Sequence, residues 1–222
     1  SGPKRCDAAK DLIALIARNV EPNATARSVG LLLAAGSGRR FDSTAPGRKL
    51  EQLIDGQSVA SRALGTLRAS CDAVLVAARS LTAPIAQEAA AMGVKVLVPE
   101  QSSLGMGYSL AALAAAVPEH FPQAETLVIA LADMPWIEPA TVRELVSASR
   151  AGNVIAQPAF DGEKGHPVVF PASYAAALAS CTGDTGARDL LRQNADHLRL
   201  VAVNDSGVVR DVDTPADLPP RR

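Results

Sequence analysis

The feature that most constrains the fold is an apolar run that ends in a glycine-rich turn. The run from Val29 to Leu33 leads directly into the turn from Ala34 to Arg40, which reads AAGSGRR. Glycine tolerates positive φ and lets backbone N–H groups approach an anion, and the two arginines add positive charge. The turn lacks the ending of a Walker A loop and the GxGxxG spacing of a dinucleotide fold. A phosphate-binding loop and an ordinary strand-to-helix turn with solvated arginines both remain open.

The rest of the chain alternates short β-branched or leucine-rich runs with alanine-rich segments of helical length. This alternation favours βαβ units and a mainly parallel sheet. The expected strands are Val29 to Ala34, Ala73 to Ala78, Val94 to Val98, Thr126 to Ala132 and Val154 to Gln157, with later additions at Pro167 to Phe170, Leu198 to Val203 and Val208 to Val212. The expected helices are Val59 to Arg68, Ala83 to Met92, Ser109 to Ala116, Pro139 to Arg150, Ser173 to Ala179 and Ala187 to Gln193. We therefore expect an α/β fold, a Rossmann-like three-layer α/β/α domain.

The N-terminal segment has a different character from the rest of the chain. Ser1-Gly2-Pro3 reads as a tag remnant, residues 7–18 carry apolar side chains at helical spacing, and a breaker segment with Pro22 follows. No repeat or low-complexity tract divides the remainder. We expect a tag remnant, helix and linker over residues 1–27 and one α/β domain over residues 28–222.

The charge balance and the cysteines exclude several classes of protein. A formal net charge of −1 provides no general attraction to nucleic acid or to an anionic membrane. Cys6, Cys71 and Cys181 form no CxxC pair, which argues against a zinc site and a disulfide-stapled secreted domain. No apolar run reaches the length of about 18 residues that a membrane-spanning helix needs. We expect a soluble, cytoplasmic protein with neither a nucleic-acid nor a membrane partner.

Two acidic sites follow apolar runs. Asp133 comes directly after the run from Leu127 to Ala132, and Asp211 and Asp213 follow Val208-Val209. Ligands bind at the carboxyl edge of open α/β sheets, and Mg²⁺ prefers one or two carboxylates there with phosphate oxygens and water. We expect Asp133 and Asp213 to bind the metal. Strand alternation puts Asp211 and Asp213 on one face, and Asp211 is the weaker candidate for the metal. For Asp213, the role of a helix N-cap stays open.

Three further turns are candidates for substrate contacts. Residues 104–110 (LGMGYSL) form a glycine-rich turn that opens a helix, where backbone N–H groups can receive an anion. His166 lies in a Gly-His-Pro sequence before an apolar run, and such a histidine is more often a hydrogen-bonded loop residue than a catalyst. Asp184 and Gly186 lie in a GDTGAR segment before another helix, which Asp184 could cap.

In their order along residues 29 to 218, these motifs resemble those of the molybdopterin nucleotidyltransferase family. The matching segments are LAAGSGRRF with Lys49 downstream, GMGYSL, DMP, GHP, GDTGAR and DVDTP. The resemblance implies catalytic roles for Arg39, Lys49, Asp133 and Asp213, with Mg²⁺ on the two aspartates. It implies acceptor contacts at His166, Asp184 and Gly186. It implies nucleotide binding by Leu33, Ala34, Ala35, Gly36, Ser37, Gly38, Arg39, Lys49, Gly105, Gly107 and Ser109.

One departure from the family pattern concerns the lysine. The spacer from Asp42 to Arg48 is longer than the family's, so either Arg48 or Lys49 could take the lysine's place; we favour Lys49. The Leu-Ala-Ala-Gly form of the loop resembles cytidylyl-transferring members. The resemblance therefore implies Mg²⁺-dependent transfer of CMP from CTP to the terminal phosphate of molybdenum-bound molybdopterin, giving molybdopterin cytosine dinucleotide and pyrophosphate.

Three alternatives remain at this stage. The first is a nucleotidyltransferase of the same fold that uses GTP or a sugar-phosphate acceptor, and the second is a non-catalytic nucleotide-sensing or cofactor-delivery module. A nicotinamide oxidoreductase is disfavoured, because GxGxxG is absent and Ala77-Ala78-Arg79 stands where that fold carries an acid. A molybdoenzyme client, or its chaperone, stays open as a partner.

Overall fold

The fold centres on one mixed, mostly parallel sheet. The structure is a computed structural model that describes residues 23–36, 41 and 48–219, so the helix expected over residues 7–18 lies outside the described residues. Among these residues, eight strands form the sheet in the order β10-β7-β9-β6-β1-β4-β5, and β8 pairs only with β7. The strands are β1 (Ser28–Ala34), β4 (Ala73–Ala78), β5 (Lys95–Leu97), β6 (Thr126–Leu131), β7 (Ile155–Phe160), β8 (Glu163–Lys164), β9 (Val168–Pro171) and β10 (Leu198–Ala202).

The pairing directions bring several strand ends to one edge. β1 pairs in parallel with both β4 and β6, and β4 pairs in parallel with β5. β9 runs antiparallel to both β6 and β7, which makes the sheet mixed. Because β1, β4 and β6 run the same way, the residues that follow them gather at a shared carboxyl edge, where open α/β sheets bind ligands.

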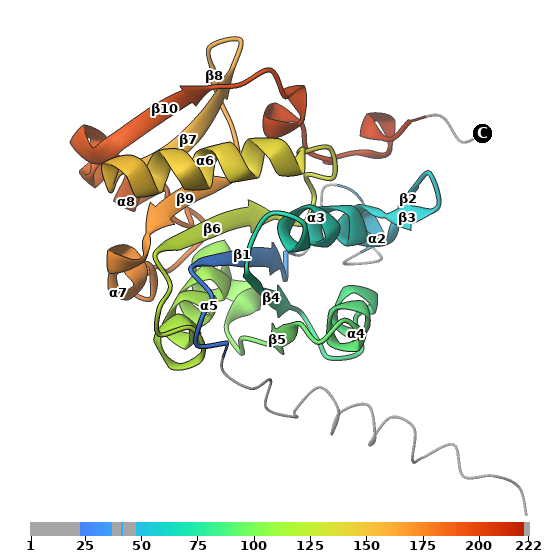
Figure 1. Cartoon of the computed structure of the whole chain (residues 1–222). Coiled ribbons are helices and arrows are strands. Elements are labelled where there is room, and N and C mark those ends of the chain that lie inside the picture. The colour runs from blue at the N-terminus through green and yellow to red at the C-terminus, as the bar shows by residue number, and fades with distance from the viewer. Residues whose placement is uncertain (1–22, 37–40, 42–47, 220–222) are drawn as a thin grey trace, which may run out of the picture.

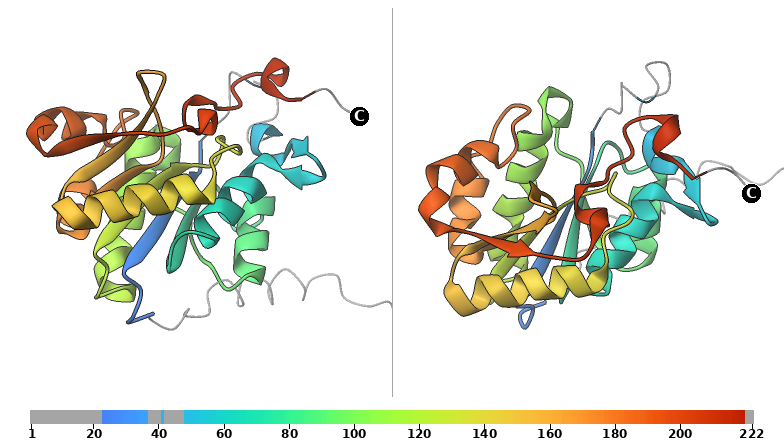
Figure 2. Two further views of the ribbon diagram at one scale, coloured as in Figure 1. Left: turned by 45° about the horizontal axis from the view of Figure 1, so that its top comes forward. Right: turned by 90° about the horizontal axis from the view of Figure 1, so that it is seen from above.

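Helices cover both faces of the sheet (Figures 1 and 2). One face packs against α3 (Val59–Arg68), α4 (Pro84–Ala91) and α6 (Pro139–Gly152). The other packs against α5 (Met106–His120), α7 (Ala175–Leu178) and α8 (Arg188–Gln193). The buried strand β1 serves both layers, because Leu32 belongs to the first core and Leu31 to the second. Two short elements, α2 (Arg48–Glu51) and the β2–β3 hairpin (Leu53–Ile54 and Gln57–Ser58), lie beside α3.

Local sequence accounts for most of these elements. Helix α3 buries the stripe of Val59, Ala63, Leu64 and Leu67, and the Ser58 side chain caps it by accepting from the N–H of Ser61. Each fully buried leucine contributes about 1.5–3 kcal/mol of transfer free energy. The α/β fold class and seven of the eight expected strands are confirmed, with ends that shift by a few residues.

Three expected elements differ in the structure. The strand expected from Val208 to Val212 is wrong: residues Ser206–Val209 form the 3₁₀ helix η4, and an irregular segment follows. The reason is a turn, because the carboxylate of Asp205 accepts from the N–H of Gly207 and bends the chain before it can pair. Helix α5 begins three residues earlier than expected. The helix expected from Ser173 to Ala179 divides into the 3₁₀ helix Ala172–Tyr174 and α7.

Two other expectations concern the chain as a whole. No helix among the described residues has the length and the apolar character needed to cross a bilayer. The division between residues 1–27 and 28–222 stays a prediction.

Candidate active site

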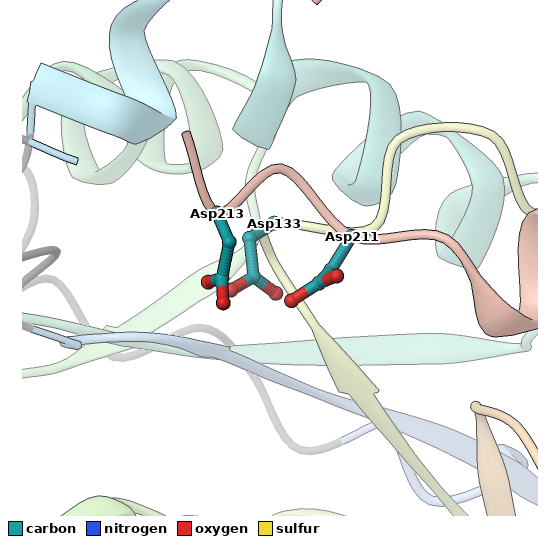
Figure 3. A group of neighbouring side chains, drawn as sticks. All are labelled: Asp133, Asp211 and Asp213. Atoms are coloured by element: carbon teal, nitrogen blue, oxygen red, sulfur yellow. The ribbon is translucent and has the colours of Figure 1, made fainter. Parts of the chain in front are cut away.

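Three aspartates converge at the carboxyl edge of the sheet. Asp133 follows the end of β6, and Asp211 and Asp213 come from the irregular segment after η4. Each carboxylate offers an oxygen, and the three oxygens lie within 4.8 Å of one another. Figure 3 shows the side chains turned toward one another from the two chain segments. The structure thus brings together the two expected metal ligands and adds Asp211 as a third.

Backbone pairing and burial of Val212 hold the second segment in place. The N–H of Val212 donates to the carbonyl of Asp133 at 2.9 Å, and the Val212 side chain is fully buried against Ile54 and Val59. The two flanking aspartates therefore project to the opposite side, as alternation predicted, although the segment is not a strand. Thr214, rather than Asp213, is the N-cap of the following 3₁₀ helix Pro215–Asp217, so the capping role considered for Asp213 is wrong.

Lys49 lies between two of the carboxylates. Its Nζ is 2.7 Å from Oδ2 of Asp133 and 3.2 Å from Oδ1 of Asp213, and the side chain is only 11% exposed. Burial acts to lower the pKa of Lys49, but the charges of the two aspartates and the hydrogen bonds to them outweigh it and raise the pKa overall. Lys49 is therefore charged, and it neutralises part of the acidic cluster.

The cluster fits a divalent cation. Oδ1 of Asp133 is buried and has no hydrogen-bond partner among the described residues. The pKa of Asp211 is raised, first by partial burial and then by the charges of Asp213 and Asp133, so the carboxylates repel one another even with Lys49 present. An all-oxygen donor set with excess negative charge is what Mg²⁺ and Mn²⁺ bind. The observed residues therefore fit the expected Mg²⁺, with three aspartates rather than two.

A cavity of about 560 Å³ lies near Asp133: Leu131, at the end of β6, and His166 line it, whereas the three aspartates and Lys49 do not. His166, Asp184 and Gly186, which come from two distant loops, all line it. Its wall is largely apolar, and three cations that sequence reasoning missed also line it: Lys164, Arg188 and Arg192. Lys164 directly precedes the GHP motif, and Arg188 is the last residue of the GDTGAR motif. Their proximity to these motifs is the sequence signal that could have identified both as lining residues. The cavity therefore combines an apolar wall with groups that suit an anionic ligand.

His166 links the cavity to the acidic cluster. Its backbone N–H donates to the carbonyl of Val208 at 2.8 Å, and its Nδ1 is buried without a partner among the described residues. Burial lowers the pKa of His166, and the opposing charge of Asp133 and a hydrogen bond to the Ile129 carbonyl do not cancel that effect. His166 is therefore a neutral imidazole in the cavity wall, and its Nδ1 is unused. It lies close enough to Asp133 for the charge of that carboxylate to act on its pKa.

The two glycine-rich turns contact each other directly. The N–H of Gly107 donates to the carbonyl of Gly183 at 2.8 Å. A Cβ on Gly105 would lie 2.3 Å from that carbonyl oxygen, and one on Gly107 would lie 2.5 Å from the carbonyl oxygen of Thr182. Glycine is required at both positions for this contact. Ser109, in the first turn of α5, is buried.

The loop after β1 is described only in part. Leu33 lines the cavity, Ala34 and Ala35 are buried, and the carbonyl of Gly36 accepts a hydrogen bond from the guanidinium of Arg79. Ser37, Gly38 and Arg39 lie outside the described residues. Their predicted nucleotide contacts stay predictions.

Comparisons with known proteins identify a family and several similar proteins. Residues 30–198 match the model of the MobA-like NTP transferase domain. Nicotine blue oxidoreductase from Paenarthrobacter nicotinovorans is 32% identical over 196 residues, covering 83% of this chain and 91% of the relative. Among solved structures, Rv0371c from Mycobacterium tuberculosis H37Rv is 27% identical with a TM-score of 0.70, covering 88% of this chain and 96% of that one.

Two further structures bear on the metal and the fold. A second structure of Rv0371c, a complex with manganese, has 27% identity and a TM-score of 0.69, covering 86% of this chain and 95% of that one. A nucleotidyl transferase from Methanothermobacter thermautotroptrophicus shares the fold, with a TM-score of 0.70 at 19% identity over 86% of this chain and 94% of that one. With three quarters of its length matched by the family model, this chain belongs to the MobA-like NTP transferase family.

Proposed function

We propose that the protein transfers CMP from CTP to the terminal phosphate of molybdenum-bound molybdopterin, giving molybdopterin cytosine dinucleotide and pyrophosphate. The observation that carries this proposal is the cluster of Asp133, Asp211 and Asp213 with Lys49, close enough to the cavity for the charge of Asp133 to act on His166 in its wall. As a MobA-like NTP transferase, the protein binds a nucleoside triphosphate. The choice of CTP and of molybdopterin rests on the resemblance of the Leu-Ala-Ala-Gly loop and the motif order to cytidylyl-transferring proteins.

The proposed reaction is an in-line substitution at phosphorus. A terminal phosphate oxygen of the acceptor forms a bond to the α-phosphorus of CTP, the bond from that phosphorus to its bridging oxygen breaks, and pyrophosphate leaves with the electron pair. No oxidant or reductant takes part. Because the attacking oxygen is already anionic, catalysis needs positioning and charge neutralisation more than a strong base.

The residues divide these tasks. Asp133, Asp211 and Asp213 would hold Mg²⁺, which supplies neutralisation of the phosphate charge when bound. Lys49, and Arg39 by resemblance, would stabilise the departing pyrophosphate. On the acceptor side, the cations that line the cavity suit an anionic ligand, and the apolar wall suits its flat ring system. The neutral imidazole of His166 donates to the Ile129 carbonyl, which leaves Nδ1 as an acceptor for an N–H group of that ring system.

A second candidate comes from the relative named nicotine blue oxidoreductase. This chain would then catalyse an oxidation–reduction in the same cavity, for which the test below supplies NADH or NADPH as the reductant. Electron transfer makes no use of three clustered carboxylates, two of them paired with a lysine, so we place nucleotidyl transfer first. The relative nevertheless means that family membership alone leaves the substrate undecided.

One assay separates these functions. The purified protein is incubated with Mg²⁺, molybdenum-bound molybdopterin and one of CTP, GTP, ATP or UTP, and pyrophosphate release is measured. We expect release with CTP only, and none from Asp133→Asn. Release with GTP instead would retain the reaction type and refute the choice of base. The second candidate would be favoured if no nucleotide gives pyrophosphate release and the protein instead oxidises NADH or NADPH when nicotine blue is added.

A further inference from the structure

A buried carboxylate outside the acidic cluster connects three loops of the site. Asp205 is only 6% exposed. Its Oδ2 accepts from the N–H of Glu138 at 2.8 Å and from the hydroxyl of Thr141 at 2.9 Å, and its Oδ1 accepts from the N–H of Gly207 at 2.8 Å. Within the described ranges, no basic side chain forms an ion pair with it. Three hydrogen bonds thus hold this charge in the interior.

The bonds from Glu138 and Thr141 tie Asp205 to the loop that begins with Asp133. Glu138 is the N-cap of α6, and its own side chain makes no capping bond, so Asp205 supplies a carboxylate at that helix N-terminus from a distant segment. The bond from Gly207 places η4 against the same loop. A Cβ on Gly207 would lie 2.3 Å from the carbonyl oxygen of Trp136, so the two backbones are in direct contact.

The other side of η4 contacts the loop that carries His166. The carbonyl of Val208 accepts from the N–H of His166, and a Cβ on Gly165 would lie 2.2 Å from that carbonyl oxygen. Three residues beyond η4, the N–H of Val212 bonds to the carbonyl of Asp133. The η4 helix therefore lies between the loop of Asp133 and the loop of His166, and it leads into the segment with the other two aspartates.

We propose that Asp205 is a positioning residue that, through η4, sets the spacing of the three metal-binding carboxylates and the placement of His166. This inference rests on the metal site of the proposed function. Carboxylates within 4.8 Å of one another repel, so their segment must be held from outside the cluster. Hydrogen bonds to a charged acceptor are roughly twice as strong as neutral ones, which suits Asp205 to this task.

Asp205→Asn tests the proposal with little change of shape. An amide has one acceptor oxygen and one NH₂ group, so in either orientation the NH₂ faces an N–H or hydroxyl donor and at least one bond is lost. We expect Mn²⁺ binding to the nucleotide-free protein, followed by the electron paramagnetic resonance signal of free Mn²⁺, to weaken about 10- to 100-fold. In the transfer assay, the Mg²⁺ concentration for half-maximal rate should rise by a similar factor.

Asp72→Asn is the matched control. Asp72 also accepts three hydrogen bonds through one carboxylate, from the N–H groups of Arg27 and Ser28 and from the Ser28 hydroxyl, at 2.8 to 3.0 Å. It lies at the opposite end of the sheet, beside the start of β1. A merely structural role for Asp205 would make both variants lose thermal stability and leave Mn²⁺ affinity alone. We expect Asp72→Asn to lose stability and to keep wild-type Mn²⁺ affinity.

The outcomes are distinct. Mn²⁺ affinity within about twofold of wild type in a folded Asp205→Asn protein would overturn the proposal. If that variant does not fold, Thr141→Val removes only one donor, and it should still weaken Mn²⁺ binding several-fold; unchanged binding would again overturn the proposal. A wild-type protein that binds no Mn²⁺ would refute the metal site and this inference together, whereas Mn²⁺ binding without CMP transfer would refute only the proposed function.

Discussion

The ammonium nitrogen of Lys49 lies 2.7 Å from Oδ2 of Asp133, a carboxylate of the acidic cluster. The same nitrogen contacts Asp213 at 3.2 Å. A lysine in this position serves two partners in turn, because it can neutralise the aspartates and can also pair with the phosphates of a nucleotide. We therefore expect lysine and metal ion to compete for the same carboxylates until the phosphates of a nucleotide pair with the ammonium group.

Lys49→Met should separate these two effects. Without the ammonium charge, the Kd of the nucleotide-free protein for Mn²⁺ should fall by about tenfold or more. Transfer should nevertheless fall by about 100-fold or more, since the phosphates lose a cation. Mn²⁺ titration and the pyrophosphate assay measure the two changes. Lys95→Met, which removes a lysine of β5 that is hydrogen-bonded to His120 at the end of α5, should alter neither. Weaker Mn²⁺ binding in Lys49→Met would contradict the competition.

Asp133→Asn should lower turnover far more than stability. We expect a loss of about 100-fold or more in transfer rate, because a metal ligand is lost, with a change of about 1 kcal/mol or less in unfolding free energy. The stability change is small because asparagine keeps the shape and the substitution also relieves repulsion from Asp211 and Asp213. Asp161→Asn, in an exposed hairpin turn with φ of 49°, is the control and should retain full activity. A fully active Asp133→Asn protein would refute the metal assignment.

His166→Gln should weaken acceptor binding without changing nucleotide binding. The imidazole lines the cavity and has a buried nitrogen with no partner among the described residues. We expect the KM for the acceptor to rise about tenfold, the equivalent of about one neutral hydrogen bond, while the KM for CTP stays unchanged. His120→Gln is the control. His120 is the last residue of α5 and does not line the cavity, so this change should alter neither constant. A rise in the KM for CTP alone would place His166 in the nucleotide site instead.

The stability that Asp72 contributes should depend on pH in the acid range. Partial burial tends to raise the pKa of Asp72, but hydrogen bonds from Ser28 and Arg27 and the charge of Arg150 lower it overall. A carboxyl whose pKa is depressed by folding stabilises the protein above its ordinary pKa of about 4 and loses that contribution as the pH falls through the lower folded-state value. The Tm difference between wild type and Asp72→Asn should therefore be largest near neutral pH and shrink in acid. A difference that grows in acid would contradict this sign.

The thiol of Cys71 should be inert in the folded protein. Burial and the neighbouring charge of Asp72 raise the pKa of this thiol to about 12. At pH 8 only roughly one molecule in ten thousand would then carry the reactive thiolate. Alkylation with iodoacetamide, followed by peptide mapping to separate Cys71 from the other cysteines, should be slow in buffer and fast in urea. Equal rates in the two conditions would show that the thiol is accessible and unperturbed.

Local sequence was sufficient for much of the fold. Apolar runs and alanine-rich segments predicted helix α3 and strand β4 to the residue, because side-chain periodicity and capping act over a few positions. The same local reasoning placed Asp133 at the carboxyl edge, since a carboxylate directly after a buried strand has nowhere else to lie. It failed for residues 208–212, where Asp205 and Gly207 form a turn whose partners lie about 70 positions away.

By itself, the sequence determined the order of strands and helices, the position of Asp133 and the candidates for the other site residues, because these depend on neighbours along the chain. Only the tertiary structure decided that Asp211 joins the acidic cluster, that Lys49 lies between Asp133 and Asp213, and that His166 shares a cavity with Asp184. Those relationships come from contacts between segments far apart in sequence, such as η4 against the loops on its two sides. No local periodicity encodes the distance between such segments, since packing and backbone hydrogen bonds set it.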